Sequence, residues 1–404
     1  MKILHGGVTA PIGFRANGVY CGIKKSKKKD LSLIVSERLC DAAGAFTTNK
    51  VQASCVVVNK EHLRDAKAQA ILANSGNANC MTGEGGFENT RAMAGAAARV
   101  LRLRKKNVLV ASTGVIGKPL PVKKIVEAIP DLVKGLDRKG SEAAAAGILT
   151  TDRVAKEMAV EFRIGSRRVR VGAIAKGAGM IRPEMTVRHA TMLCFVTTDA
   201  AITAAALRDA LGRAVERTFN TITIDGDMST NDMVLVLANG MAQNRRIVEK
   251  TQEFRIFSKA LEAIFLQLAK RMIRDAEGAT KFVEISVKNA ASRQDARAVA
   301  RAVAGSNLFK CALFGSDPNW GRIAAAVGYA GAHVDPWKMQ IYLGKELVSK
   351  NGGRVKKKAA ILNRIFAQKN IRVTVDLGVG KYGATSYTCD FSTSYVRINS
   401  AYRT

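Results

Sequence analysis

Apolar residues along the chain gather in short segments of two kinds, and together they predict an α/β fold. Some segments are continuous runs rich in branched and aromatic residues, which is typical of buried strands, whereas others repeat their apolar residues at helical spacing. We expect strands at 31–37, 51–59, 68–73, 107–111, 191–198, 280–287 and 308–314, and a hairpin over 157–175. We expect helices at 88–103, 122–135, 141–148, 203–219, 252–275 and 322–329, and a mixture of strands and short helices over 338–391.

The stretch 176–200 has two halves of opposite character, and the junction between them singles out Thr191. The first half carries glycines, a proline and several charges, which predicts a loop. The second half, 191–198, is the apolar run expected to form a buried strand. If the bond between Ala190 and Thr191 were cut, Thr191 would gain a free α-amine beside its own hydroxyl, which is one way to activate a hydroxyl nucleophile. On composition alone, an ordinary β-branched residue at the start of a strand is the simpler interpretation.

Length and composition are those of a soluble protein of two or three domains, with 404 residues of which 47% are hydrophobic. No apolar run reaches the roughly 18 residues of a membrane span, and the N-terminal segment has no signal-like pattern. The seven cysteines are scattered and form no C-x-x-C pair, which argues against a zinc site or a disulfide framework. We therefore expect a cytoplasmic protein without membrane association.

Charge is the unusual feature, because 64 Lys and Arg against 33 Asp and Glu give a net charge of +31. Such a charge is typical of proteins that bind nucleic acids or anionic surfaces. The densest basic clusters, at 24–29, 102–106 and 354–358, have no interleaved aromatic residues, and no zinc-finger or RNA-recognition signature accompanies them. We interpret them as solvated loops and helix ends, and we expect no nucleic-acid partner.

Eight motifs occur along the chain in the order found in one enzyme family. They are ANSGNAN at 73–79, ASTGVIG at 111–117, TTD at 150–152, KGAGMI at 176–181 with ATML at 190–193, TIDGDMSTND at 223–232, EGATK at 277–281, DPNWGR at 317–322 and RINSAYRT at 397–404. On these motifs the chain resembles the ornithine acetyltransferase family, also called bifunctional glutamate N-acetyltransferases, from about residue 7 to residue 404.

The resemblance implies a two-domain mixed α/β fold, with mixed sheets packed against helices, and a chain that cuts itself between Ala190 and Thr191. The two pieces would be 1–190, with the oxyanion hole, and 191–404, which begins with the nucleophile. The implied activity moves an acetyl group from N-acetylornithine to glutamate through an acetyl-threonine enzyme, a step of arginine biosynthesis. The resemblance also implies a heterotetramer with two copies of each piece. It implies no metal or organic cofactor, and acetyl-CoA is a second donor in bifunctional members.

Residue roles carried over from the family cover every part of the expected reaction. Thr191 is the nucleophile, Thr113 and Gly114 form the oxyanion hole, and Thr150, Lys176, Thr191, Glu277, Asn399 and Thr404 contact the substrate. The chemistry fits, because an acyl-transfer intermediate needs two preorganised donors and glycine lets the backbone come close. Each residue also has a structural interpretation. Ser-Thr-Gly after a strand is usually a turn with a helix cap, and the segment 74–79 fits an active-site loop and a tight turn about equally well.

Three aspartates, Asp225, Asp227 and Asp232, invite comparison with a calcium loop. Their spacing does not match an EF-hand and no glutamate closes the loop, so we interpret the segment as a mainly structural acidic turn and expect no metal.

The chain departs from the family's pattern beside the expected cut. It has P-E-M-T-V-R-H-A-T where the family usually has P-x-M-A-T, so four extra residues, Thr186–His189, precede Ala190. The insertion could slow self-cleavage by moving the bond relative to the oxyanion donors. A lone histidine in an insertion is more often incidental than catalytic, so we assign His189 no role.

Two other functions compete with acetyl transfer. An N-terminal-nucleophile amidase or aminopeptidase would use the same threonine but give the acyl group to water, and glutamate would not accelerate its reaction. A nucleic-acid-binding protein would show retention on DNA or RNA that falls steeply with salt concentration.

The first prediction concerns the cut. The proposed base is the α-amine of Thr191, and this amine exists only after the preceding bond breaks. Denaturing mass spectrometry of active enzyme should therefore find two pieces, residues 1–190 and 191–404, that stay together under native conditions. A wholly intact chain with full activity would contradict the terminal-amine mechanism, and an intact chain without activity would indicate a precursor stalled by the insertion.

Overall fold

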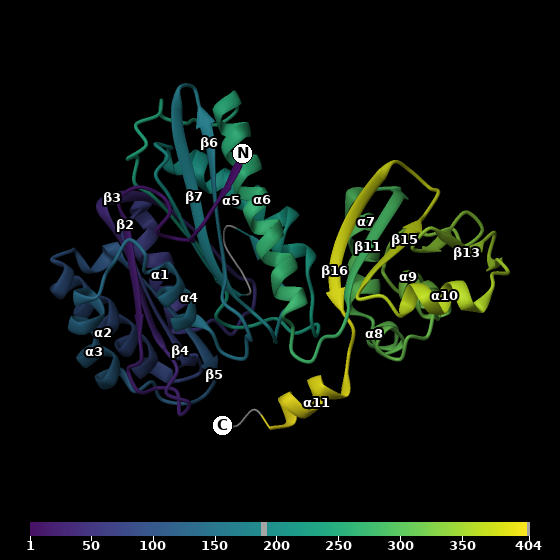
Figure 1. Ribbon diagram of the computed structural model, residues 1–404, viewed down its shortest axis with the longest axis horizontal. Helices are drawn as coiled ribbons and strands as arrows, with labels where there is room; N and C mark the ends of the chain where they lie inside the picture. Colours follow the sequence, from purple (N-terminus) through teal and green to yellow (C-terminus); the bar gives the residue numbers. More distant parts are fainter. Residues whose placement is uncertain (187–191, 402–404) are drawn as a thin grey trace.

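A computed structural model of the protein describes residues 1–186 and 192–401, and it has two lobes joined near residue 280 (Figure 1). The larger lobe contains the chain up to the end of α6 (Gln252–Arg274), and the smaller lobe contains the elements from β11 (Phe282–Ala290) to β16 (Tyr382–Cys389). The last helix, α11 (Thr393–Ser400), leaves the smaller lobe and reaches back toward the larger one. The expected α/β class with mixed sheets is confirmed.

Within the described residues, ten strands of the larger lobe form one mixed sheet. They are β1 (Lys2–Leu4), β2 (Phe14–Val19), β3 (Leu31–Thr47), β4 (Lys67–Asn77), β5 (Val108–Val115), β6 (Lys156–Ile164), β7 (Arg167–Lys176), β8 (Met185–Thr186), β9 (Leu193–Thr198) and β10 (Met233–Ala238). Their order is β1-β6-β7-β9-β10-β3-β4-β5, and β2 and β8 also pair with β3. The pairs β9–β10 and β4–β5 are parallel, and the other pairs are antiparallel.

Helices cover both faces of this sheet, and for this reason every residue of the central strands β9 and β10 is buried. The covering helices are α1 (Ser54–His62), α2 (Gly83–Leu101), α3 (Val122–Lys134), α4 (Ser141–Ile148), α5 (Ala204–Arg217) and α6. In β9, Cys194 and Val196 pack with α5 and α6, whereas Leu193 and Phe195 pack with α1 to α4. A strand with two buried faces shows a continuous apolar run, as the sequence of 191–198 does.

The prediction of a strand at 51–59 is wrong, because most of these residues form helix α1. A short apolar run does not distinguish a buried strand from a buried helix. In α1, the side-chain amide of Asn59 donates to the Val110 carbonyl oxygen (2.8 Å) and accepts from the Val110 N–H (2.9 Å). These bonds satisfy backbone groups of the edge strand β5, so tertiary contacts outweigh the strand preference of the valines.

The smaller lobe has a sheet of six strands among the described residues, in the order β14-β13-β12-β15-β11-β16, and helices pack on it. Its further elements are β12 (Gln340–Leu343), β13 (Glu346–Lys350), β14 (Gly353–Arg354), β15 (Asn370–Asp376), α7 (Arg293–Gly305), α8 (Asn307–Phe314), α9 (Trp320–Gly328) and α10 (Ala359–Phe366). The strand expected at 308–314 is wrong, since these residues form α8. Its buried Phe309, Ala312 and Leu313 have helical spacing, and the Ser306 side chain caps it by accepting from the Phe309 N–H (3.3 Å).

The boundary between the lobes does not coincide with the expected cut. The ten-stranded sheet contains β7 from the N-terminal side of the bond and β9 and β10 from its C-terminal side. The predicted hairpin is present as β6 and β7, which turn at Gly165 and end at Lys176.

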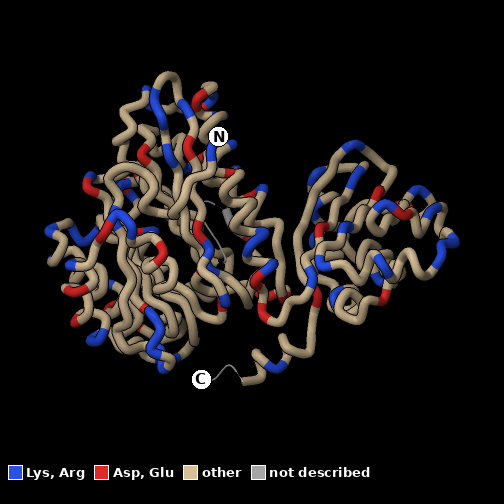
Figure 2. Tube along the Cα trace, viewed as in Figure 1, with Lys and Arg blue, Asp and Glu red and all other residues tan. Residues whose placement is uncertain are grey.

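Basic residues are spread over both lobes (Figure 2). The three predicted basic clusters lie in connections and at element ends, and most of their side chains are exposed, as expected. Across the described residues, no helix combines the length and apolar character that crossing a bilayer requires.

Candidate active site

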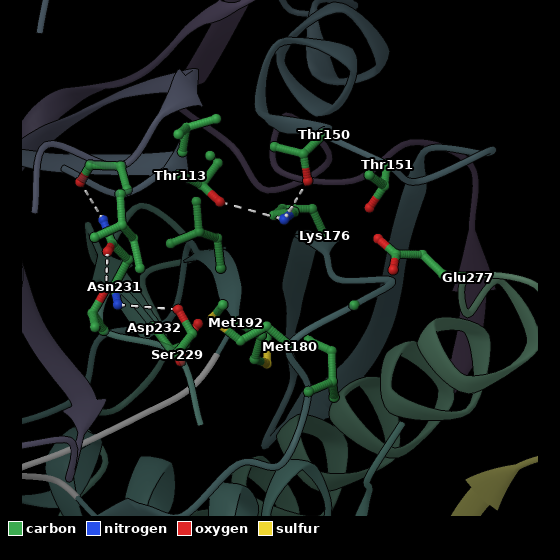
Figure 3. Close-up of a pocket in the computed structure, with 18 of the residues that line it drawn as sticks. Thr113, Thr150, Thr151, Lys176, Met180, Met192, Ser229, Asn231, Asp232 and Glu277 are labelled. Atoms are coloured by element: carbon green, nitrogen blue, oxygen red, sulfur yellow. Dashed lines mark hydrogen bonds between the residues drawn. The ribbon is translucent and has the colours of Figure 1, made fainter. Parts of the chain in front are cut away.

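A cavity of about 290 Å³ lies in the larger lobe where the carboxyl ends of β5 and β7 meet the start of β9 (Figure 3). Its wall also includes residues 179–181, the segment 229–232 before β10, Glu277 after α6 and Asn399 from α11. The structure brings together six of the residues singled out from the sequence. They are Thr113, Gly114, Thr150, Lys176, Glu277 and Asn399.

Three of the sequence-predicted residues, Ala190, Thr191 and Thr404, lie outside the described residues, as do 187–189 of the insertion. Met192, which follows Thr191 directly in the chain, lines the cavity. It has a φ of +118°, a backbone conformation that costs free energy for any residue except glycine. The backbone next to the expected cut is therefore strained.

Gly114 occupies a position in β5 that only glycine fits. Its φ is +133°, and a Cβ there would lie 2.4 Å from the Gly76 carbonyl carbon and 2.5 Å from the Asn77 nitrogen in β4. Strand β5 continues to Val115, so Thr113 and Gly114 belong to a strand and not to a turn that caps a helix. The close approach of the two backbones fixes the direction of this strand end at the cavity.

The segment 74–79 supports the site from outside it. Its asparagines are buried and bonded to neighbouring segments: Asn74 accepts from the Ser112 hydroxyl (2.7 Å), and Asn77 donates to the carbonyl oxygen of Pro119 (3.1 Å). Of this segment, Ala78 lines the cavity. Neither the active-site loop nor the tight turn expected from the sequence fully describes this segment. Strand β4 runs through Asn77, and the polar side chains hold β5 in place.

Lys176 lies at the centre of the polar wall, at the end of β7. Its Nζ donates to the hydroxyl oxygens of Thr150 (2.8 Å) and Thr113 (3.4 Å), as Figure 3 shows. Its side chain is 10% exposed, and the Asp152 carboxylate lies 4.0 Å away. The lysine is thus a nearly buried cation that links the strand of Thr113 to the loop of Thr150.

Asp152 is the centre of a buried ion network behind Lys176. Burial acts to raise the pKa of its carboxyl, but the charges of Lys176 and Lys156 outweigh this effect and lower the pKa to about 2. Lys156 Nζ lies 2.7 Å from Asp152 and 2.6 Å from Asp275, which in turn pairs with Arg153 (3.2 Å). The Asp152 carboxylate is therefore charged at neutral pH.

Glu277 supplies negative charge to the same cavity. It is 8% exposed, and its backbone N–H donates to the Ala178 carbonyl oxygen (2.9 Å). The Asn399 side chain of α11 donates to its carboxylate (2.8 Å). A Cβ at Gly179 would lie 2.5 Å from one carboxylate oxygen, so a glycine there makes room for the acid.

The acidic turn has the structural role expected for it. Asp225 accepts from the backbone N–H groups of Met180 (2.6 Å) and Ile181 (2.9 Å) and from the Tyr395 hydroxyl (3.1 Å), which holds the wall segment and α11 in place. In the part of the chain that the structure describes, no three His, Cys, Asp or Glu side chains group as they would around a metal ion.

One wall of the cavity is formed by Ser229, Thr230 and Asn231, to which the sequence analysis assigned no role, together with Asp232 of the acidic turn. Asn231 anchors it by donating to the carbonyl oxygens of Ala78 (2.5 Å) and Ser112 (2.8 Å). Beyond the family resemblance, the motif TIDGDMSTND was interpreted only through its aspartates. A run of four polar residues directly before an apolar strand was the available signal.

Comparison with known proteins identifies the family that the chain as a whole matches. The ArgJ family model matches residues 15–404. An arginine biosynthesis bifunctional protein ArgJ of Caldanaerobacter subterraneus subsp. tengcongensis is 47% identical over 408 residues, and a glutamate N-acetyltransferase of Methanocaldococcus jannaschii is 44% identical over 418; both matches cover 100% of each chain. A crystal structure of an ArgJ protein from Bacillus halodurans matches with 39% identity and a TM-score of 0.50, covering 51% of this chain and 97% of that chain.

The second prediction tests the packing of Gly179 on Glu277. Gly179→Ala should lower the urea midpoint by an amount equivalent to about 1–3 kcal/mol, because the added methyl forces the carboxylate to move. Gly85→Ala is the control, since nothing lies within 4 Å of a Cβ at this helical glycine, and it should leave stability unchanged or slightly raised. Equal midpoints for wild type and Gly179→Ala would show that the Glu277 carboxylate is not held in place and moves aside without a cost in stability.

Proposed function

Because the chain belongs to the ArgJ family, we propose that it transfers the acetyl group of N-acetylornithine to glutamate, a step of arginine biosynthesis. One observation supports this cavity as the site of the reaction. The Lys176 ammonium, which donates to the Thr150 and Thr113 hydroxyls, shares the cavity with the Glu277 carboxylate. A cation and an anion in one small chamber complement an amino acid, which carries a carboxylate and an ammonium group.

In the first half-reaction, we assign Thr191 as the nucleophile after the bond to Ala190 is cut. Its Oγ bonds to the acetyl carbon, its α-amine takes the hydroxyl proton, and the carbonyl oxygen becomes an oxyanion. The carbon–nitrogen bond to ornithine then breaks, and the departing amine takes the proton from the α-amine. The product is ornithine and an acetyl ester on Thr191.

In the second half-reaction, the amine of glutamate attacks the ester carbon and loses a proton to the α-amine of Thr191. The ester bond breaks, Thr191 Oγ takes the proton back, and N-acetylglutamate leaves. The acetyl group is conserved and the enzyme returns to its starting form. Water in place of glutamate would make the enzyme an amidase, so the acceptor decides between the two functions.

We assign Thr113 and Gly114 as the hydrogen-bond donors that stabilise the oxyanion in both half-reactions. Lys176 donates to Thr113 Oγ1 (3.4 Å), which leaves the hydroxyl hydrogen of Thr113 free to donate to a second acceptor. Lys176 also brings positive charge close to the developing oxyanion. Fixed donors in a site that excludes water stabilise such a charge without reorganisation.

Lys176 and Thr150 are assigned to a substrate carboxylate, and Glu277 and Asn399 to its ammonium end. Thr404, outside the described residues, is assigned to the substrate on the family resemblance alone. No metal or organic cofactor enters these steps, and acetyl-CoA would serve as a second acetyl donor in the same site.

The active form that we propose contains the pieces 1–190 and 191–404, with two copies of each in a heterotetramer. The solved relative supports the two pieces, since 97% of its chain corresponds to about half of this one. The proposed location is the cytoplasm, because all seven cysteines are free thiols, which a reducing compartment preserves.

The third prediction tests the nucleophile. Thr191→Ala should abolish both self-cleavage and acetyl transfer, because one hydroxyl is assigned to both, and Thr191→Ser should keep part of each. Consumption of N-acetylornithine by wild type should accelerate when glutamate is added. Transfer activity in Thr191→Ala would refute the acetyl-threonine intermediate, and consumption that is indifferent to glutamate would make the protein an amidase.

The fourth prediction tests the oxyanion donor. Thr113→Ala should slow turnover about 10²–10³-fold, as the loss of one such donor typically does, with little change in thermal stability. Thr113→Ser retains the hydroxyl and should stay within about tenfold of wild type. Unchanged turnover in the alanine variant would remove Thr113 from the mechanism.

A further inference from the structure

Asp152 does not line the cavity, but it is hydrogen-bonded to two neighbours of Lys176. One is the next residue in the chain, Gly177, and the other is Thr150, which bonds to the Lys176 side chain. The Asp152 side chain is fully buried, and its carboxylate accepts from the backbone N–H groups of Gly177 (2.7 Å) and Thr150 (3.2 Å). Gly177 shares a peptide bond with Lys176, and the Thr150 hydroxyl accepts from Lys176 Nζ. One carboxylate therefore holds the strand end that carries the lysine and the loop that carries its hydrogen-bond partner.

Asp152 lies close to the Lys176 ammonium group but forms its short ion pair with Lys156. Two carboxylates, Asp152 and Asp275, are matched by Lys156 and Arg153, which lie 2.7 Å and 3.2 Å from them. Lys176 is the fifth charged group, and its distance of 4.0 Å from Asp152 exceeds that of a hydrogen bond. Because Lys156 makes the short contact, Asp152 attracts Lys176 from 4.0 Å without taking up a hydrogen-bond donor of the Lys176 ammonium group.

We propose that Asp152 is the positioning residue of this site: it sets the direction of Lys176 and Thr150 while Lys156 makes the short contact with its carboxylate, so that the Lys176 ammonium stays available to a substrate carboxylate. The assignment of that carboxylate rests on the proposed function. The positioning itself rests on the hydrogen bonds to Gly177 and Thr150. Asp152 touches neither substrate nor reacting atoms in this proposal.

A matched control exists at the opposite end of the same hairpin. Asp199 is also buried, and its carboxylate also accepts two backbone N–H groups, from Arg170 (2.7 Å) and Ile12 (3.1 Å). Arg170 lies near the start of β7, and Lys176 is the last residue of this strand. Asp199, the residue after β9, does not line the cavity, so Asp199→Asn perturbs a buried carboxylate that is hydrogen-bonded to the same strand, β7, at a distance from the site.

The fifth prediction compares Asp152→Asn with Asp199→Asn in two measurements on folded, self-cleaved protein. Hydrogen exchange should accelerate at the amides of Thr150 and Gly177 in Asp152→Asn only. Calorimetry with ornithine as the probe should show binding weakened at least about tenfold in Asp152→Asn, because small displacements of positioning groups have large effects, and within about twofold of wild type in Asp199→Asn. In turnover, KM for N-acetylornithine should rise more than kcat falls.

A double-mutant cycle with Lys176→Met separates positioning from general stability. If Asp152 acts mainly through Lys176, Asp152→Asn should weaken ornithine binding less in Lys176→Met than in wild type, because only the Thr150 contact remains to be displaced. Independent, multiplicative effects of the two substitutions would overturn the proposal. So would equal effects of Asp152→Asn and Asp199→Asn on affinity.

If Asp152→Asn does not accumulate as folded protein, Asp152→Glu takes its place. It keeps the charge that Lys156 needs but moves the carboxylate by one methylene, so exchange at Gly177 should still accelerate and ornithine should still bind more weakly. Wild-type affinity in this variant would refute the positioning role. Absence of acetyl transfer in wild type would instead refute the proposed function, and the exchange data would still decide the role of Asp152.

Discussion

The base of the cavity depends on one ammonium group, that of Lys156, which is 0% exposed and lies 2.7 Å from Asp152 and 2.6 Å from Asp275. Without it, the two buried carboxylates would keep only Arg153 and the more distant Lys176 as cationic partners, and breaking a buried pair typically costs about 3–5 kcal/mol. The two aspartates come from distant parts of the chain, the loop before β6 and the end of α6. The ion network therefore fixes the helix that leads to Glu277 against the strand that ends at Lys176, and so sets the spacing of the two opposite charges in the cavity.

Much of the fold follows from local sequence pattern. Long amphipathic helices such as α5 and α6, and the hairpin that turns at Gly165, have strong periodic signals and lie where the pattern predicts them. The two segments that the pattern misassigned, α1 and α8, are short apolar runs whose conformation is decided by partners elsewhere. In α1 that partner is the backbone of Val110, which Asn59 satisfies from 51 residues away. No window of local sequence contains this contact.

The site was only partly accessible to sequence reasoning, for a related reason. The cavity residues Thr113, Lys176 and Glu277 are too far apart in the chain for spacing to connect them, and the family resemblance supplied the connection. Residue roles that depend on contacts between distant parts of the chain could not be predicted from the sequence. The asparagines of 74–79 support β5 from outside the cavity, and Asp152 was visible only as part of the TTD motif until its contacts with Gly177 and Lys156 were known.

Strand β9 lies in the interior of a sheet between β7 and β10, and β10 in turn pairs with β3. A cut before β9 would therefore leave two polypeptides interleaved in one sheet, with β3 and β7 in the first and β9 and β10 in the second. Before the cut, folding is a first-order process within one molecule; after it, reassembly from denatured pieces is second-order and slows as the protein is diluted. Maturation would thus make unfolding effectively irreversible, and the lifetime of the mature enzyme would be set by its rate of unfolding and not by an equilibrium.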